Sequence, residues 1–294
     1  MSSKRNRRAI GKGPRSAAVV RRTLVRDVIT ATGRIMVSGI LTPDEVHDTR
    51  KRIKRARATL ALLRPALPEP DHEACDGALR TAGRSLAAAR DSTVMARTYA
   101  SMRTRAGLTR RSSARDAIDL ATGQNEPKAT DVVRARRHLE SAAERLARAP
   151  LHARGWAPLG SGLRAVYRRG RRRRPKPGTS TSSEALHAWR RHAKRYWHVL
   201  ELFEAVNPRR LAPAIAGARR LSDVLGEEHD LALLAARLRG RRGREDRKVL
   251  EAVIEQRAKL TRRAMKLGNH LYAEPARTVE RQMRDDWERW CRSA

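Results

Sequence analysis

Apolar residues recur every three or four positions along almost the whole chain, and this spacing predicts helices. The first helix is expected over residues 17–38, where one face carries Val20, Leu24, Val28, Ala31 and Ile35. Alanine, leucine and arginine, which all favour helix, dominate the sequence, and no segment alternates β-branched and polar residues as a strand does. We therefore predict an all-α fold.

Capping signals mark where several helices begin. Thr42 stands before Pro43, and Glu45 follows three residues after Thr42, which is the pattern of a capping box. A second helix is expected from there to residue 64. A similar signal before Glu184 and the Asn207-Pro208 pair open two more. The full set of later helices is expected over residues 71–89, 91–105, 130–149, 183–206, 208–226, 229–240, 245–272 and 276–292, with a break at 150–158 and a short helix after it.

Glycine, proline and basic residues divide the chain into segments. Residues 1–15 are expected to form a disordered basic arm, and residues 16–150 and 183–294 to form two helical halves. Residues 151–182 form a basic connection that contains the arginine run at 168–174 and a Pro/Gly-containing linker at 175–180. The arginine run has two interpretations, a second contact for an anion and a solubilising loop.

Two motifs occur in the same order in both halves. His47-x-x-Arg50-Lys51-x-x-Lys54-Arg55 reappears in the second half as His187-x-x-Arg190-Arg191-x-x-Lys194-Arg195. Farther along, Arg90-Asp91 reappears as His229-Asp230, at an offset that differs from the first by a single position. Like-ordered motifs at a nearly constant offset predict an internal duplication, and so two similar helical bundles.

The first motif places its basic residues on one side of a helix. Residues three and four apart are neighbours on a helix surface, so one cationic stripe consists of His47, Arg50, Lys51 and Lys54, and a second of His187, Arg190, Arg191 and Lys194. Apolar residues on the other faces should pack the bundles: Val46, Ile53, Leu60 and Leu63 in the first half, and Leu186, Trp189, Ala193, Leu200 and Phe203 in the second. Neighbouring like charges destabilise a helix by a few tenths of a kcal/mol per pair. Such stripes suit a row of phosphates; the alternative is two solvated basic faces.

The charge of the chain narrows the choice of partners. Its 66 Lys and Arg residues against 31 Asp and Glu give a formal net charge of +35, which favours a dense anion such as nucleic acid, polyphosphate or an anionic membrane. Arginine, which outnumbers lysine, favours bidentate phosphate contacts, although a GC-rich genome would also enrich it. Aromatic residues are only 3% of the chain, which argues against a platform that stacks single-stranded bases.

Other patterns argue against whole classes of protein. The sequence has no run of 18 apolar residues, so we expect no membrane insertion. The charged N-terminal residues do not form a secretory signal, so we expect a cytoplasmic protein. The two cysteines, Cys75 and Cys291, predict neither a disulfide framework nor a zinc site. The tryptophans at 156, 287 and 290 are expected in the core or between the bundles.

We expect neither enzymatic activity nor a cofactor. Walker-type loops, dinucleotide fingerprints, nucleophile elbows and His-Glu-x-x-His pairs are missing from the sequence. Asp91 and Asp230 are expected to begin helices, where an aspartate caps free N–H groups. His47 and His187 have no neighbouring carboxylate at ligand spacing, so hydrogen bonding to phosphate is favoured over metal binding.

At these motifs the chain resembles the CHAD family, the conserved-histidine α-helical domain. The resemblance rests on the two stripes, on Arg90-Asp91, and on Leu221-x-x-x-Leu225-Gly226-x-x-His229-Asp230, and it spans roughly residues 17–293. It implies two helical bundles related by pseudo-twofold symmetry around a basic central channel, binding of inorganic polyphosphate, and association with polyphosphate granules. Besides the two stripes, it implies a binding role for Arg55, Arg57, Arg90 and Arg195.

Three differences from the family pattern occur in the second half. Trp197 stands where the first repeat has Arg57, His198 occupies a place where the family often has tyrosine, and His229 replaces a common asparagine. Some members of the family carry a fused triphosphatase module with an alternating Glu-x-Glu-x-Lys strand, and this chain has no such motif.

Two other functions stay open at this point. A nucleoid-type protein that binds DNA or RNA without sequence specificity would spread its positive charge over a convex surface. A metal-dependent phosphohydrolase would bring His47, His187, Asp91 and Asp230 within metal-ligand distance.

Overall fold

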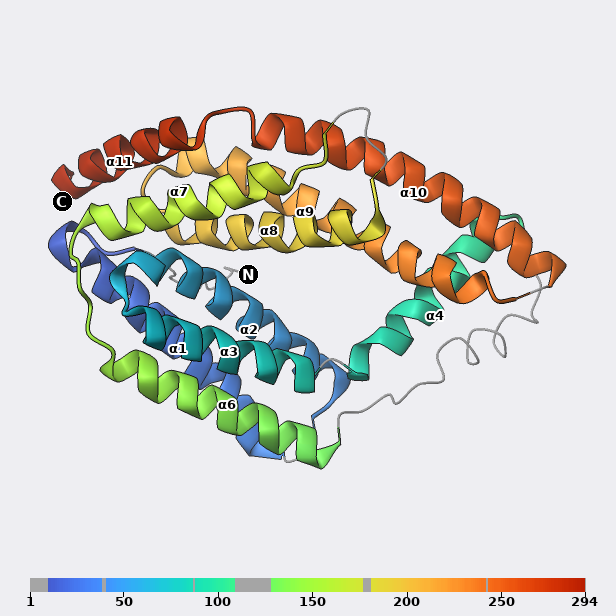
Figure 1. Ribbon diagram of the computed structural model, residues 1–294, viewed down its shortest axis with the longest axis horizontal. Coiled ribbons are helices and arrows are strands. Elements are labelled where there is room, and N and C mark those ends of the chain that lie inside the picture. The colour runs from blue at the N-terminus through green and yellow to red at the C-terminus, as the bar shows by residue number, and fades with distance from the viewer. Residues whose placement is uncertain are drawn as a thin grey trace, which may run out of the picture.

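The computed structural model describes residues 10–38, 41–86, 88–108, 128–176, 181–241 and 243–293, with the side chains of residues 14, 36–38 and 88–93 excepted. The described residues form helices and their connections, which confirms the all-α prediction (Figure 1). In chain order the elements are the short 3₁₀ helix η1 (Gly13–Arg15), α1 (Ser16–Ser38), α2 (Pro43–Leu63), the 3₁₀ turn η2 (Arg64–Ala66), α3 (Glu69–Ser85), α4 (Ala88–Arg105), α6 (Ala129–Arg148), α7 (Trp156–Arg173), α8 (Ser183–Phe203), α9 (Pro208–Leu238), α10 (Arg244–Leu271) and α11 (Ala276–Arg292).

The helices form two groups that lie one above the other in Figure 1. Helices α1, α2, α3 and α6 pack together in one group, and α7 to α11 in the other, while α2 also contacts α7 and α8. Helix α8 begins and ends at the same offset from α2 that separates His187 from His47, and α7 begins at that offset from α1. Helix α9 begins at the offset from α3 that separates Asp230 from Asp91. The helix bounds thus repeat with the same offsets as the sequence motifs.

Local signals place the two helices that carry the stripes. The Thr42 hydroxyl accepts a hydrogen bond from the Glu45 backbone N–H at 3.3 Å, and Glu45 Oε2 accepts one from the Thr42 backbone N–H at 2.9 Å, so the predicted capping box is confirmed. Ser182 caps α8 in the same way, by accepting from the Ala185 N–H at 3.2 Å. The apolar residues expected on the other faces of both helices are buried. The stripes are therefore turned away from the core.

Helix α9 corrects the prediction of two helices, 208–226 and 229–240. It is one helix from Pro208 to Leu238, so Asp230 lies inside it and does not cap a helix start. A glycine inside a helix costs only about 1 kcal/mol relative to alanine, and tertiary packing readily outweighs that amount. Buried Leu221, Val224 and Leu231, spaced three and seven residues apart, continue one apolar face past Gly226.

Helix α7 corrects the prediction for residues 150–182. It begins at Trp156, with Pro158 in its first turn, where a missing N–H is tolerated. Residues 168–173 belong to its last turns, so the loop interpretation of the arginine run is wrong, and most of the expected connection is a packed helix. At Gly162 an added Cβ would lie 1.9 Å from the Leu62 carbonyl oxygen, so the backbones of α7 and α2 are in direct contact there.

The prediction of a disordered arm over residues 1–15 is wrong for residues 10–15. Ile10 is buried, and its N–H donates to the Leu202 carbonyl at 3.2 Å. The Trp287 indole N–H donates to the Gly11 carbonyl at 3.3 Å, and residues 13–15 form η1. Residues 10–15 are therefore part of the fold, while residues 1–9 lie outside the described part of the chain.

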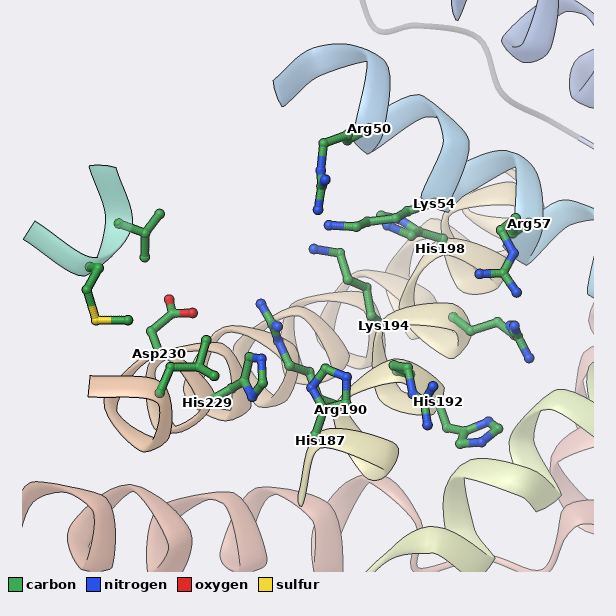
Figure 2. A pocket seen from close by; sticks show the side chains of 15 residues that line it. Arg50, Lys54, Arg57, His187, Arg190, His192, Lys194, His198, His229 and Asp230 are labelled. Atoms are coloured by element: carbon green, nitrogen blue, oxygen red, sulfur yellow. The ribbon is translucent and has the colours of Figure 1, made fainter. Parts of the chain in front are cut away.

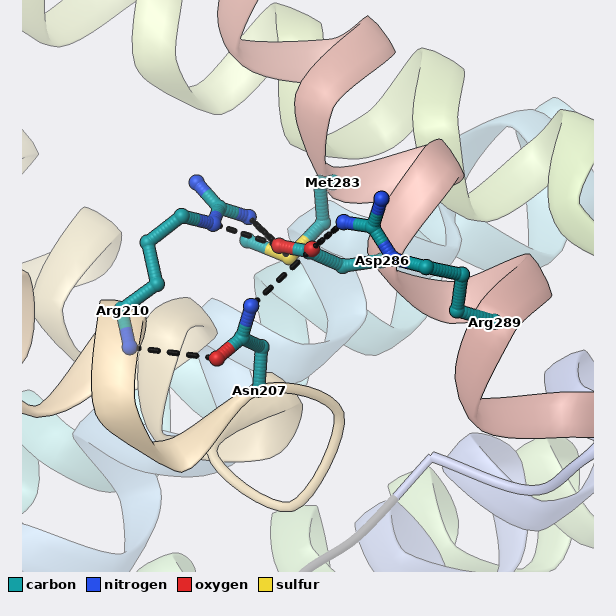
Figure 3. A network of polar contacts seen from close by, with 5 residues as sticks. All are labelled: Asn207, Arg210, Met283, Asp286 and Arg289. Carbon is teal, nitrogen blue, oxygen red and sulfur yellow. Dashed lines mark hydrogen bonds and ion pairs between the residues drawn. The ribbon is translucent and has the colours of Figure 1, made fainter. Parts of the chain in front are cut away.

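The tryptophans and a polar network join the ends of the second group. Trp156 is buried, with its ring 5.6 Å from that of Trp287, and Trp290 packs against the core, as expected. Asp286, only 3% exposed, accepts hydrogen bonds from Asn207 at 3.0 Å and from Arg210 and Arg289 (Figure 3). Burial by itself would raise the pKa of Asp286, but these donors outweigh it and lower the pKa. The start of α9 is thereby fixed to α11.

Helix α4 connects the two groups at their other end. It leaves the first group and packs against α9 and α10 (Figure 1). The Tyr99 hydroxyl donates to Asp246 at 3.0 Å, and buried Arg103 pairs with Glu245 at 2.7 Å. None of the helices in the described ranges combines the length and the apolar character needed to cross a membrane.

Candidate functional site

A cavity of about 570 Å³ lies between the two groups of helices, and we call it the main cavity. Helices α2 and α8 form its basic walls, and α4 and α9 complete it (Figure 2). It is lined by Arg50, Lys54, Arg57, Val94, Met95, His187, Arg190, Arg191, His192, Lys194, Arg195, His198, His229, Asp230 and Leu233. Figure 2 shows the side chains of Lys54 and Lys194 extending toward the same space from opposite helices.

A smaller cavity of about 320 Å³, the side cavity, adjoins the main one. Lys54, Arg190, Lys194, His198 and Asp230 line both cavities, so the two share a wall. The rest of the lining of the side cavity includes His47, Lys51, Trp197, Ser222, Asp223, Gly226 and Glu227.

The structure brings ten of the twelve predicted binding residues to these cavities. Arg50, Lys54, Arg57, His187, Arg190, Arg191, Lys194 and Arg195 line the main cavity, and His47 and Lys51 line the side cavity. Arg55 is half-buried and lines neither cavity. The side chain of Arg90 lies outside the described residues. Both stripes thus face the same interior space.

Sequence reasoning missed several lining residues. His192 lies within the span of the second stripe on α8 and His198 one turn after it, and His229 and Asp230 come from the second half of α9. The repeated His229-Asp230 motif could have indicated these two residues. The prediction of a helix end at Gly226 instead assigned Asp230 a role as a helix cap. Val94, Met95 and Leu233 add a small apolar wall that no polar motif could indicate.

On the α2 wall, two arginines are held by their own contacts. Arg50 donates to the carbonyls of Leu86 at 2.6 Å and Gly83 at 3.5 Å, at the carboxyl end of α3, where the helix dipole favours a cation. Arg57 pairs with Asp76 through two hydrogen bonds, at 2.9 Å and 3.3 Å. Burial alone would raise the pKa of Asp76, but Arg57 and Arg80 together bring it to about 2. Both arginines therefore stand in fixed orientations at the cavity.

On the α8 wall, the fold makes room for the second stripe. The guanidinium of Arg190 lies against Gly226, where an added Cβ would be 3.2 Å from Nη2. Lys194 lies 5.8 Å from the ring centre of Trp197, which stacks on His198. His198 is oriented by Glu201, 2.9 Å from its Nδ1. The glycine in the Leu-Gly-Glu-Glu-His-Asp segment thus positions a cation.

The main cavity is strongly positive. Seven lysine and arginine side chains and four histidines line it, against one carboxylate, Asp230. Burial and the charge of Arg57 lower the pKa of Arg195 to about 10, so Arg195 remains a cation at neutral pH. Such a concentration of like charge in a concave site attracts anions from solution.

Two histidines of the main cavity, His187 and His192, are neutral at pH 7. Burial, with His229 at a ring distance of 4.2 Å, lowers the pKa of His187 to about 4. Burial and the charge of Arg195 lower the pKa of His192 to about 4 as well. In the neutral form each ring offers one N–H donor, and an anion placed beside it would stabilise the protonated form.

The site offers donors and positive charge more than reactive groups. Within the described ranges no three His, Cys, Asp or Glu side chains are placed to hold a metal ion. Burial raises the pKa of the Cys75 thiol to about 11, and Cys75 is absent from both cavity linings. What this arrangement can do chemically is hold several phosphate or sulfate groups at once.

The profile of the CHAD domain family matches residues 36–239, which hold both stripes and all the lining helices. The chain belongs to the CHAD domain family. The fold of this CHAD domain is similar to two solved structures. PptA from Streptomyces chartreusis is 17% identical, with a TM-score of 0.54 over 89% of this chain and 98% of PptA. The CHAD domain from the plant Ricinus communis is 16% identical, with a TM-score of 0.53 over 95% of this chain and 93% of that one. No curated protein sequence matches the chain.

Proposed function

We propose that this CHAD domain binds inorganic polyphosphate in the main and side cavities, without catalysing a reaction of its own. The observation that carries this proposal is the convergence of both cationic stripes on the main cavity and on the side cavity that adjoins it. Eight lysine and arginine residues line the two cavities together: Arg50, Lys51, Lys54, Arg57, Arg190, Arg191, Lys194 and Arg195. A linear chain of phosphates has a charge in every unit, so it can meet cations from both walls along its length.

The lining also indicates which anion fits. Arginine and lysine hydrogen-bond phosphate oxygens, and fixed guanidinium groups such as those of Arg50 and Arg57 do so with little loss of side-chain freedom. A chain of phosphates without sugars or bases can be bound through hydrogen bonds from arginine and lysine to its oxygens alone. Association with polyphosphate granules in the cytoplasm is part of the same proposal.

Nucleic acid is a weaker candidate for this site. Single-stranded binders stack bases on aromatic side chains, and among the described residues the two cavities have one phenylalanine, tyrosine or tryptophan in their lining, Trp197, whose ring already stacks on His198. A duplex requires an open basic surface, whereas both stripes face into a cavity. The high net charge still predicts non-specific contact with nucleic acid at low salt.

Competition at one fixed salt concentration tests the proposal. Long-chain polyphosphate, double-stranded DNA, RNA and heparin are titrated, at equal charge concentration, against a fluorescent polyphosphate bound to the protein. We expect unlabelled polyphosphate to displace the probe at the lowest concentration. Displacement by DNA or RNA at equal or lower concentration would assign the site to nucleic acid instead.

A further inference from the structure

The arginine run of α7 is divided between different faces of the helix. Five arginines stand in residues 168–173, and all five side chains are exposed. Arg171 donates to the Tyr272 carbonyl at 3.1 Å, on the side of α10. Their positions around the helix therefore decide which of them can meet a ligand in the main cavity.

Arg169 and Arg173 lie on the face of α7 that packs against α2. Gly162, Val166, Arg169 and Arg173 follow one another at spacings of four, three and four, which places them in one row. Gly162 touches the Leu62 backbone of α2, and Val166 is buried. The row thus starts in the contact with α2 and continues as arginine beyond it. Arg168 and Arg172 stand outside this row, on a neighbouring edge that is exposed to solvent.

The two arginines of this row lie beside the lining of the main cavity. Helix α7 packs against α8 as well as α2, and His192 and Arg195 of α8 line the cavity. Figure 2 shows His192 at the side of the cavity that faces α7. The charges of Arg169 and Arg173 both contribute to the low pKa of His192, and Arg169 contributes to that of Arg195.

No carboxylate within the described ranges neutralises this row. Neither Arg169 nor Arg173 has an ion pair or a side-chain hydrogen bond with another described residue. Asp76, the acid whose charge acts on Arg195, is already shared by Arg57 and Arg80. Positive charge therefore continues from Arg57 through Arg195, past His192, to α7.

We propose that Arg169 and Arg173 are a second binding segment, over which a polyphosphate chain continues after it leaves the main cavity. This inference rests on the proposed function and specifies a preference for chain length. A short oligomer fills the cavity and does not reach α7, whereas a long chain contacts both. The gain in affinity with chain length is therefore carried by these two arginines.

The test compares two double variants with the same loss of charge from the same helix. R169Q/R173Q removes the proposed segment, and R168Q/R172Q removes two exposed arginines from the solvent edge. Each is titrated with tripolyphosphate and with long-chain polyphosphate at about 0.1 M salt, after circular dichroism has shown unchanged helix content. A slope of about 0.7 per contact corresponds to roughly fivefold in affinity for each charge at this salt, so about 25-fold for two.

We expect R169Q/R173Q to bind long-chain polyphosphate about 25-fold more weakly and to bind tripolyphosphate as the wild type does. R168Q/R172Q should change both affinities by less than about twofold, the size of a screened, distant charge effect. Equal losses in the two variants, or an equal loss for both ligands in R169Q/R173Q, would overturn the inference.

A third variant separates this inference from the proposed function. K54Q/K194Q changes the two cavities and leaves α7 intact. If it loses affinity for both ligands while R169Q/R173Q binds both as the wild type does, the cavity is the site and the α7 segment is refuted. If neither variant differs from wild type, the proposed function itself fails.

Discussion

Neutralising Lys54 and Lys194 is the most direct test of the cavity as the binding site. Eight lysines and arginines line the two cavities. If about six of them each neutralise a phosphate, the slope of log affinity against log salt is about −4, at roughly 0.7 per charge. K54Q/K194Q should change the slope to about −3 and weaken binding about 25-fold at about 0.1 M salt.

Isothermal titration over a salt series measures both quantities. K248Q/K266Q is the control, because both lysines lie on α10, line neither cavity, and give the same change in net charge. We expect this control to keep the wild-type slope. Equal flattening in the two variants would mean that the whole charge of the protein attracts the polymer, and that the stripes are only solvated faces.

Three further predictions address the walls, the histidines and the absence of catalysis. Gly226→Leu should displace the Arg190 guanidinium and lower the affinity for polyphosphate at unchanged helix content, whereas Gly217→Leu, in the same helix with open space around it, should leave affinity unchanged in the same titration. The free protein should lose stability as the pH falls from about 6.5 to about 4, because in this range the unfolded chain binds protons that His187 and His192 do not bind in the folded protein. Thermal denaturation over this pH range measures the effect. The pH dependence should be weaker in His192→Gln than in His270→Gln, the control, because His270 is exposed on α10. Polyphosphate, nucleotides and pyrophosphate should stay intact with Mg²⁺, Mn²⁺ or Zn²⁺, and phosphate release that disappears in His47→Ala would contradict this.

Local signals made most helix starts predictable. Thr42 with Glu45, and Ser182 before α8, are complete within one helical turn, so their effect does not depend on the rest of the fold. The periodic apolar residues of α2 and α8 likewise indicated which face would be buried. The opposite, cationic faces then followed from helix geometry alone.

Contacts between distant segments could not be predicted in this way. Gly226 is typical of a helix end when the sequence alone is considered. The structure gives another reason for a glycine at this position, because the Arg190 guanidinium packs against it. The pairing of Arg57 with Asp76 joins α2 to α3, and no pattern within either helix indicates it. The side of the main cavity formed by α4 and α9 likewise depends on how α4 crosses to the second group.

The contact between Gly162 and Leu62 has a mechanical consequence for the cavity. The backbones of α7 and α2 are in contact there without a side chain between them, so no side chain can change its conformation to let the two helices move closer together. Because this crossing lies at the carboxyl end of α2, it fixes that end of the helix against the second group. Any widening of the cavity must then be a rotation, small at Arg57 and largest at Arg50, where α4 spans the two groups. The backbone contact between α7 and α2 thus fixes one end of the cavity, and the polar contacts of Tyr99 and Arg103 with α10 limit how far the other end can open.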